Sequence, residues 1–288
     1  MKNNKSMTWY NKYLEIYNKP FTSVAPKVIE EIRGKLKKIQ SGTPIVSVVL
    51  IAYNEEPRIL SCLWSLCENL CDFPLEILTV NNNSTDKTSD VLDSVGATWI
   101  NEEKKGPGHA RQCGLNHARG VYHICIDADT IYPPRYIETH VRELMKPEIA
   151  CTFGLWSFIP GKEHSQVGLF VYEMLRDIHL HMQAFKRPEL CVRGMVFGFK
   201  TEFAKKIGFR TDILRGEDGS MALAMKPFGK LKFITSRQAR VMTSSATLDT
   251  DGSLFNSLKN RIIKAIKGIA GLFFKKTEYK DEDSNLLK

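Results

Sequence analysis

The sequence predicts an α/β fold in which a mostly parallel central sheet is flanked by helices. Beyond residue 44, short runs rich in β-branched residues alternate with helical patterns, which is typical of such a sheet. The chain has 288 residues, of which 43% are hydrophobic, so it can bury one large core or two small ones. Polar residues follow the strands, and ligands of open α/β sheets bind at the carboxyl ends of strands.

The first half is the more regular. Residues 1–43 suggest helical turns broken by Pro20 and Pro26, an extension that precedes the sheet. Strands are expected at 45–52, 75–81, 98–101 and 122–127, and helices at 56–70, 85–95 and 107–119. We expect Ser84 or Thr85 to cap the second of these helices, with Asp86 in its first turn.

The second half is less regular, as expected where a second substrate is held. A strand is predicted at 149–158, a helix at 165–185 and a strand at 191–199. A helix should begin near 217, followed by short strands at 231–235 and 239–243.

Charge is concentrated at the two ends of the chain. The net charge is +9, but residues 1–43 hold nine basic and three acidic side chains and residues 252–288 hold eight and four, which leaves −1 for 44–251. A near-neutral body argues against a nucleic-acid groove.

Several classes of protein are disfavoured. Apolar runs such as 48–52 and 268–274 fall far short of the roughly 20 residues that a spanning helix needs, and the basic N-terminus has no apolar stretch behind it. The seven cysteines are scattered without a Cys-x-x-Cys pair. This pattern favours reduced, buried thiols in a cytoplasmic protein over a zinc site.

Two motifs suggest a site for an anion and a cation. Asp127-Ala128-Asp129 ends a strand, where paired carboxylates can hold Mg²⁺ or Mn²⁺, although a turn that caps the next helix is an equal alternative. Gly106 to Arg111 opens a helix and lacks the pattern of a P-loop or a dinucleotide fingerprint. Arg111 and Lys104 or Lys105 could neutralise a diphosphate, but solvated surface cations are the simpler interpretation of the lysines.

A third motif, Glu217-Asp218, follows Arg215-Gly216 at a helix start. Carboxylates there can complement the helix dipole, and one can equally act as a general base that accepts a proton from an attacking hydroxyl.

In combination, these motifs resemble the family 2 glycosyltransferases, inverting enzymes of the GT-A fold that use nucleotide-sugar donors. The resemblance covers roughly residues 44–244 and rests on segments 48–55, 81–88, 106–120, 126–129 and 216–218 in that order. It implies a catalytic domain at 44–251, with a nucleotide-binding half at 44–130 and an acceptor-side half at 131–251. Residues 252–288 would then be a separate helix and charged tail.

The resemblance also implies roles for single residues. Ala52, Tyr53 and Glu55 would line the nucleotide pocket, and Asn82 stands where the family has an aspartate that accepts a hydrogen bond from the base. Arg111 would lie near the nucleotide or its phosphates.

The remaining implied roles concern the metal and the transfer step. Asp127 would contact the ribose or the sugar beside the metal, and Asp129 would bind Mn²⁺ or Mg²⁺ on the diphosphate. Asp218 would be the catalytic base, with Glu217 in support. The implied reaction moves one sugar, with inversion, from a nucleotide sugar, in the first instance a UDP-sugar. The acceptor would be a hydroxyl of a sugar or lipid-linked sugar, in the synthesis of cell-surface polysaccharide or glycolipid.

Some positions depart from the family pattern or leave alternatives open. Asn81-Asn82 replaces the usual pair of aspartates, 243–246 offers no histidine, and the Gln-x-x-Arg-Trp motif of processive synthases is missing. Gly194, in the strand expected at 191–199, would make room for an acceptor sugar or mark a plain core strand. Trp156 could stack on a sugar or lie in the core.

Residues 252–277 contain six basic residues and no acidic one. On a helix they would present an apolar stripe opposite the charges, suited to an anionic membrane surface on the cytoplasmic side or to packing on the catalytic domain. Two other functions stay open: a sugar-nucleotidyltransferase, for which a glycine-rich loop after the first strand is missing, and an inactive nucleotide-sugar-binding module.

Overall fold

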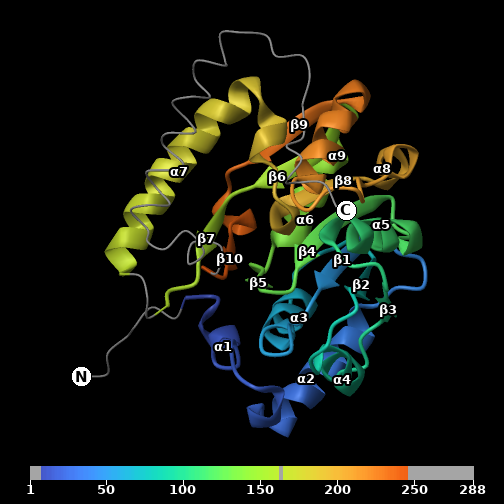
Figure 1. Cartoon of the computed structure of the whole chain (residues 1–288), viewed down its shortest axis with the longest axis vertical. Helices are drawn as coiled ribbons and strands as arrows, with labels where there is room; N and C mark the ends of the chain where they lie inside the picture. The colour runs from blue at the N-terminus through green and yellow to red at the C-terminus, as the bar shows by residue number, and fades with distance from the viewer. Residues whose placement is uncertain (1–7, 162–164, 246–288) are drawn as a thin grey trace.

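The computed structural model describes residues 8–161 and 165–245. The segment 252–277 and the tail behind it therefore lie outside the described residues. The predicted α/β fold is confirmed: helices surround a seven-stranded sheet, and a small three-stranded sheet lies beside it (Figure 1).

The first half alternates strands and helices as predicted. Its elements are α1 (Asn11–Leu14), η1 (Phe21–Ser23), α2 (Pro26–Ile39), β1 (Val46–Ala52), α3 (Ile59–Cys67), β2 (Leu75–Asn81), α4 (Thr88–Ser94), β3 (Trp99–Asn101), α5 (Pro107–His117) and β4 (Tyr122–Asp127). β1 and β2 are buried on both faces, because α5 packs on both strands and α2 also contacts β2.

The second half is more irregular, also as predicted. Its elements are β5 (Thr130–Ile131), α6 (Tyr136–Leu144), β6 (Ile149–Gly154), β7 (Trp156–Phe158), α7 (Gln166–Lys186), η2 (Pro188–Cys191), η3 (Gly194–Val196), β8 (Phe197–Lys200), α8 (Thr201–Ile207), α9 (Glu217–Met225), η4 (Lys226–Phe228), β9 (Lys230–Ile234), η5 (Arg237–Ala239) and β10 (Val241–Thr243). α7 runs along the edge of the molecule away from β1–β3 (Figure 1).

The large sheet has the strand order β3-β2-β1-β4-β8-β6-β9. Only β8 runs antiparallel to its neighbours β4 and β6, and all other pairs are parallel. The small sheet has the order β5-β10-β7. The carboxyl ends of β2, β1 and β4 therefore lie side by side, with Ala52 opposite Asn81 and Ile51 opposite Asp127.

Three expectations about local structure are wrong. The strand expected at 149–158 breaks at Leu155 into β6 and β7, which belong to different sheets. Of the strand expected at 191–199, only 197–199 belong to a strand, β8, whereas Cys191 ends one 3-10 turn and Gly194–Val196 form another. An apolar run does not by itself distinguish these conformations.

The third concerns the start of α4. Its N-cap residue is Lys87, so Ser84, Thr85 and Asp86 all precede the helix and serve the neighbouring loop instead.

The N-terminal extension is joined to the main core although it adds no strand to the sheet. Tyr13, Ile32 and Leu36 are buried among the core residues, and the Ser61 hydroxyl on α3 donates a hydrogen bond to the Tyr13 carbonyl. The division of the chain into an extension, a catalytic domain and a tail stays a prediction. No helix in the described ranges combines the length and apolar character that crossing a bilayer requires.

Candidate active site

A pocket of about 490 Å³ opens at the carboxyl ends of β1 and β4. This is a usual volume for a small-molecule site. All nine site residues predicted from the sequence line it: Ala52, Tyr53, Glu55, Asn82, Arg111, Asp127, Asp129, Glu217 and Asp218. The structure thus brings together residues that lie up to 166 positions apart in the sequence.

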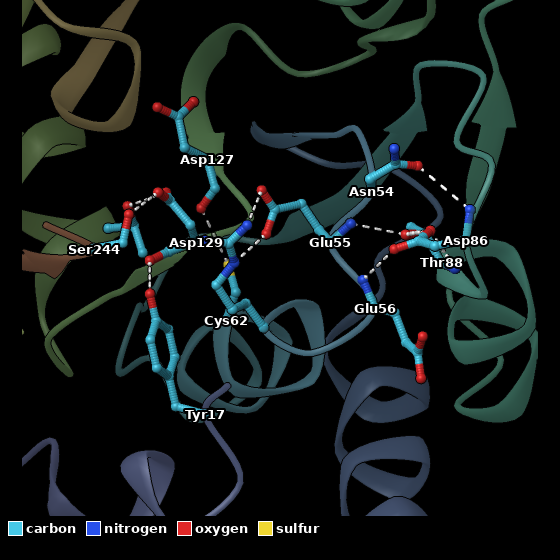
Figure 2. Close-up of polar contacts among 12 residues, drawn as sticks. Tyr17, Asn54, Glu55, Glu56, Cys62, Asp86, Thr88, Asp127, Asp129 and Ser244 are labelled. Carbon is cyan, nitrogen blue, oxygen red and sulfur yellow. Dashed lines mark hydrogen bonds and ion pairs between the residues drawn. The ribbon is translucent and has the colours of Figure 1, made fainter. Parts of the chain in front are cut away.

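The loops after β1 and β2 are tied to each other by hydrogen bonds (Figure 2). Asn54 Oδ1 accepts from the Thr85 amide at 2.7 Å, and the Asn54 amide donates to the Ser84 hydroxyl at 2.9 Å. The Glu55 amide donates to Thr88 Oγ1 at 2.9 Å. These bonds explain why polar residues follow both strands, since they fix the backbone from which Glu55 enters the pocket.

The Glu55 carboxylate is held by Arg58, whose Nε donates to Oε2 at 2.7 Å. Burial raises the pKa of Glu55 to about 7, and the charges of Asp129 and Asp127 add to this against the opposing effect of Arg58. Glu55 therefore lines the pocket among like charges.

Asn82 braces the loop that follows β3. Its amide nitrogen donates to the carbonyls of Glu102 and Lys104, at 3.1 and 2.7 Å, and its Oδ1 accepts from the Gly106 amide at 2.8 Å. Both amide hydrogens are thus used within the protein, which leaves only the remaining acceptor capacity of Oδ1 for a ligand. The base-binding role of Asn82 stays a prediction.

The same loop brings an exposed lysine to the pocket. Lys105 lines the pocket with its ammonium 5.8 Å from the centre of the Tyr53 ring, whereas Lys104 is not among the lining residues. The only sequence signal was the position of Lys105 directly before Gly106, at the start of the loop that opens α5.

Arg111 joins the two acidic motifs. Its side chain is 2% exposed; Nη2 donates to Asp127 Oδ1, and Nε lies 3.4 Å from Asp218 Oδ1. Burial lowers the pKa of Arg111, but Asp127 and Asp218 outweigh it, so that pKa stands well above its usual value. The arginine is a permanent cation between the end of β4 and the start of α9.

Gly194 makes room for this ion pair. A Cβ built on Gly194 would lie 1.8 Å from Arg111 Nη2 and 2.7 Å from Asp218 Oδ2. The expectation that Gly194 leaves space for an acceptor sugar is therefore wrong, because protein side chains fill that space. Trp156 is a core residue, 5% exposed, with the Arg176 guanidinium 4.4 Å from its ring centre.

Glu217 and Asp218 form the first turn of α9, next to the pocket. The helix is capped by Gly216 in the left-handed region, at φ 98°, which turns the chain so that both carboxylates line the cavity. Burial raises the pKa of Glu217, and the neighbouring Asp218 raises it further. Asp218 Oδ1 accepts no hydrogen bond from the described residues. That atom is buried and lies 3.4 Å from Arg111 Nε.

Asp129 is oriented from two directions (Figure 2). The Ser244 hydroxyl, just beyond β10, donates to its Oδ2 at 2.6 Å, and the Tyr17 hydroxyl donates to its backbone carbonyl at 2.8 Å. Sequence reasoning missed both residues. Position 244 was noted only for lacking a histidine, and Tyr17 comes from the N-terminal extension, 112 positions away.

The lining of the pocket carries more acidic than basic side chains. Among the described residues it is lined by five carboxylates but only two cations, Arg111 and Lys105. Burial raises the pKa of Asp127 to about 6, with Asp129 and Asp218 adding to this against Arg111. No three His, Cys, Asp or Glu side chains of the described residues are grouped so that they could hold a metal alone.

A family model described as Glycosyl transferase family 2 matches residues 47–208. Curated relatives include a putative glycosyltransferase, EpsH, of Bacillus subtilis, 34% identical over 105 residues, which cover 35% of this chain and 30% of the relative. An uncharacterized glycosyltransferase of Escherichia coli, YaiP, is 33% identical over 189 residues, which cover 60% of this chain and 45% of the relative. The matches thus span less than half of these two relatives.

Two solved structures share the fold. S. aureus TarS in complex with UDP matches with a TM-score of 0.52 at 20% identity, covering 69% of this chain and 60% of that one. The mannosyltransferase PcManGT of Pyrobaculum calidifontis, in complex with GDP-Man and Mn²⁺, matches with a TM-score of 0.54 at 20% identity. The match covers 82% of this chain and 69% of PcManGT.

Proposed function

Since the chain belongs to glycosyltransferase family 2, we propose that it transfers one sugar from a nucleoside-diphosphate sugar to an acceptor hydroxyl in this pocket. The observation that carries the proposal is that a single cavity joins the ends of β1 and β4 to the carboxylates of α9, with Arg111 between them. A donor bound at the strand ends would therefore present its sugar to a base on α9.

The donor is proposed to be a UDP-sugar. Tyr53 and Lys105 lie together on one wall, where an aromatic ring can stack on a base and an ammonium can contact a phosphate. The UDP held by the TarS neighbour supports this choice, while the GDP-Man held by the other neighbour shows that the fold also accepts another base.

Asp129, together with Asp127, would hold Mn²⁺ or Mg²⁺ in this pocket. A divalent cation bound there supplies positive charge to the leaving diphosphate. Ser244 and Tyr17 hold the Asp129 carboxylate and backbone, so the chain orients this ligand in advance. The Thr130 and Thr243 hydroxyls contact Oδ1, whereas Oδ2 accepts from Ser244 and keeps a lone pair for a metal.

Asp218 is proposed as the general base. It would accept the proton of the acceptor hydroxyl as that oxygen attacks the anomeric carbon from the face opposite the diphosphate, which inverts the configuration in one displacement. Arg111 positions Asp218 from the side, and Glu217 supports it at the helix start. No covalent intermediate with the enzyme is needed.

The acceptor is proposed to be a sugar or a lipid-linked sugar used in cell-surface polysaccharide or glycolipid synthesis. A cytoplasmic location, at the cytoplasmic face of a membrane, likewise stays a prediction.

A panel of UDP-, GDP- and dTDP-sugars with Mn²⁺ tests the function. We expect release of nucleoside diphosphate from one donor, accelerated by acceptor sugars. Exchange of pyrophosphate into the donor would instead identify a nucleotidyltransferase. Binding of donors without turnover, even in the presence of lipid-linked acceptors, would identify an inactive binding module.

A further inference from the structure

One face of α7 exposes an unusual amount of apolar surface. Eight of its large hydrophobic side chains are exposed, from 38% for Leu175 to 89% for Phe185: Val167, Phe170, Val171, Met174, Leu175, Ile178, Met182 and Phe185. They recur at helical spacing along the whole 21-residue helix, opposite the buried stripe of Leu169, Tyr172, Arg176 and Leu180. A contiguous patch of this kind marks an interaction surface.

The same face of α7 carries no acidic charge. The other exposed residues of the helix are Gln166, His181 and Lys186. Its two acids point inward instead: Glu173 accepts from the Ser157 hydroxyl at 2.7 Å, and Asp177 is paired with Arg176 and Arg240. The face is therefore apolar with a basic end and has nothing to repel an anionic partner.

The last described strand, β10, lies next to the strand that precedes α7. β10 pairs in parallel with β7, the strand that precedes α7, and the Ile159 amide donates to the Thr243 carbonyl at 2.8 Å. The last described strand thus lies beside the segment that leads to α7. In sequence the chain continues with the stretch 252–277, which has six basic residues and no acidic one.

We propose that the exposed face of α7 docks on an anionic lipid bilayer, independently of the transfer reaction proposed above. The acyl region of a bilayer can bury the eight apolar side chains, and anionic headgroups can attract Lys186 and the basic residues of the stretch 252–277. Charge favours an anionic bilayer as the occupant, because Lys186 is exposed at one end of the face and no carboxylate of α7 is among its exposed residues.

Co-sedimentation of the full chain with vesicles tests the proposal. We expect binding to vesicles of mixed phosphatidylcholine and phosphatidylglycerol, and weaker binding to phosphatidylcholine alone. Phe170→Glu combined with Ile178→Glu should weaken binding to the mixed vesicles by at least about tenfold, since two large side chains lose their apolar contact. The matched control, Val121→Glu with Met145→Glu, changes two exposed hydrophobic residues outside α7 and should bind like the unaltered chain.

A second measurement locates the contact on α7 itself. Met182→Cys labelled with an environment-sensitive fluorophore should shift to the blue with mixed vesicles, while Met145→Cys should not. Unchanged vesicle binding by the α7 double variant, or no shift at position 182, would overturn the proposal. So would a vesicle-independent dimer that the double variant converts to a monomer, or a cross-link from position 182 to 252–277 that persists with vesicles. Release of nucleoside diphosphate without vesicles is followed in parallel and should be equal in all variants, so a failure of the proposed reaction is seen separately.

Discussion

The Arg111 guanidinium occupies the space that a side chain at Gly194 would need. An ideal Cβ on Gly194 would lie 1.8 Å from Arg111 Nη2, the atom that also holds Asp127. The glycine thus allows one buried cation to contact the carboxylate at the end of β4 and the carboxylate on α9 at the same time. Breaking such a buried pair from one side leaves an uncompensated charge, which costs about 3–5 kcal/mol.

Gly194→Ala should therefore damage the site. The added methyl group displaces Arg111 and with it Asp127 and Asp218, so we expect transfer to fall about a hundredfold. The free energy of unfolding, measured by urea denaturation, should fall by about 1–3 kcal/mol because the position is overpacked.

Gly34→Ala is the matched control. Gly34 is an exposed interior residue of α2 with no atom within 4 Å of its ideal Cβ. The same change there should leave transfer unaltered and raise the free energy of unfolding by about 0.5–1 kcal/mol. Equal transfer by the Gly194 and Gly34 variants would show that the Arg111 arrangement does not matter for activity.

Lys105→Ala should weaken donor binding. Its ammonium is the cation in the lining of the pocket for which the structure shows no carboxylate partner among the described residues, so it can contact a phosphate. We expect the donor KM to rise about tenfold with little change in kcat. Lys104→Ala removes the same charge one residue outside the pocket lining and should leave KM within about twofold. Equal effects of the two variants would contradict the placement of Lys105.

Tyr17→Phe tests whether the N-terminal extension supports the proposed metal ligand. The substitution removes the hydrogen bond to the Asp129 carbonyl, a net contribution of about 1 kcal/mol. The Mn²⁺ concentration for half-maximal release of nucleoside diphosphate should rise about fivefold, while the rate at saturating Mn²⁺ stays close to normal. A lower saturating rate with unchanged Mn²⁺ demand would mean that Tyr17 acts elsewhere. Removal of metal with EDTA should abolish release in both proteins.

Because of the buried His123, we expect the free energy of unfolding to fall in acid. His123 is buried on β4, stacked at 4.6 Å on Phe199, and both ring nitrogens lack a hydrogen-bond partner among the described residues. Burial lowers its pKa to about 3, with Arg111 and Lys205 adding to this. The unfolded chain therefore takes up a proton below about pH 6.5 that the folded chain refuses, so the stability present above that pH is lost as the pH falls.

His123→Phe keeps the stacking and removes the proton site. Between pH 7 and pH 5 the free energy of unfolding of the variant should gain about 2 kcal/mol relative to the unaltered chain. His140 and the pocket carboxylates titrate in both proteins and cancel in the comparison. If urea denaturation gives the same difference in the free energy of unfolding between the two proteins at pH 7 and at pH 5, the prediction is contradicted.

The sequence predicted the regular half of the fold well because local patterns determine it. β2 and β4 have the predicted bounds, and β1 differs by one residue, since β-branched runs followed by polar residues mark strands and their ends. The strand expected over 191–199 failed because the conformation around Gly194 depends on Arg111 and Asp218, which are distant in sequence.

The site, too, has features that local sequence patterns reveal and features that depend on contacts between residues distant in the sequence. Eight of the nine predicted pocket residues stand at strand ends, just after them or at the start of α9, where a sequence pattern can be recognised; the ninth, Arg111, lies in α5. Tyr17 and Ser244 support Asp129 from 112 and 115 positions away, and such contacts exist only once the chain has folded. For the same reason, the sequence did not predict the hydrogen bonds of Asn82 to the loop 102–106.

Asp218→Asn, followed by calorimetry with UDP and Mn²⁺ and by an assay of sugar transfer, tests the central claim most directly. The asparagine keeps the size of the side chain but cannot accept the acceptor proton. Binding of UDP with Mn²⁺ should stay within about threefold of the unaltered chain, and transfer should fall at least about a thousandfold. Turnover at the unaltered rate would contradict the account, because Asp218 would then not be the base.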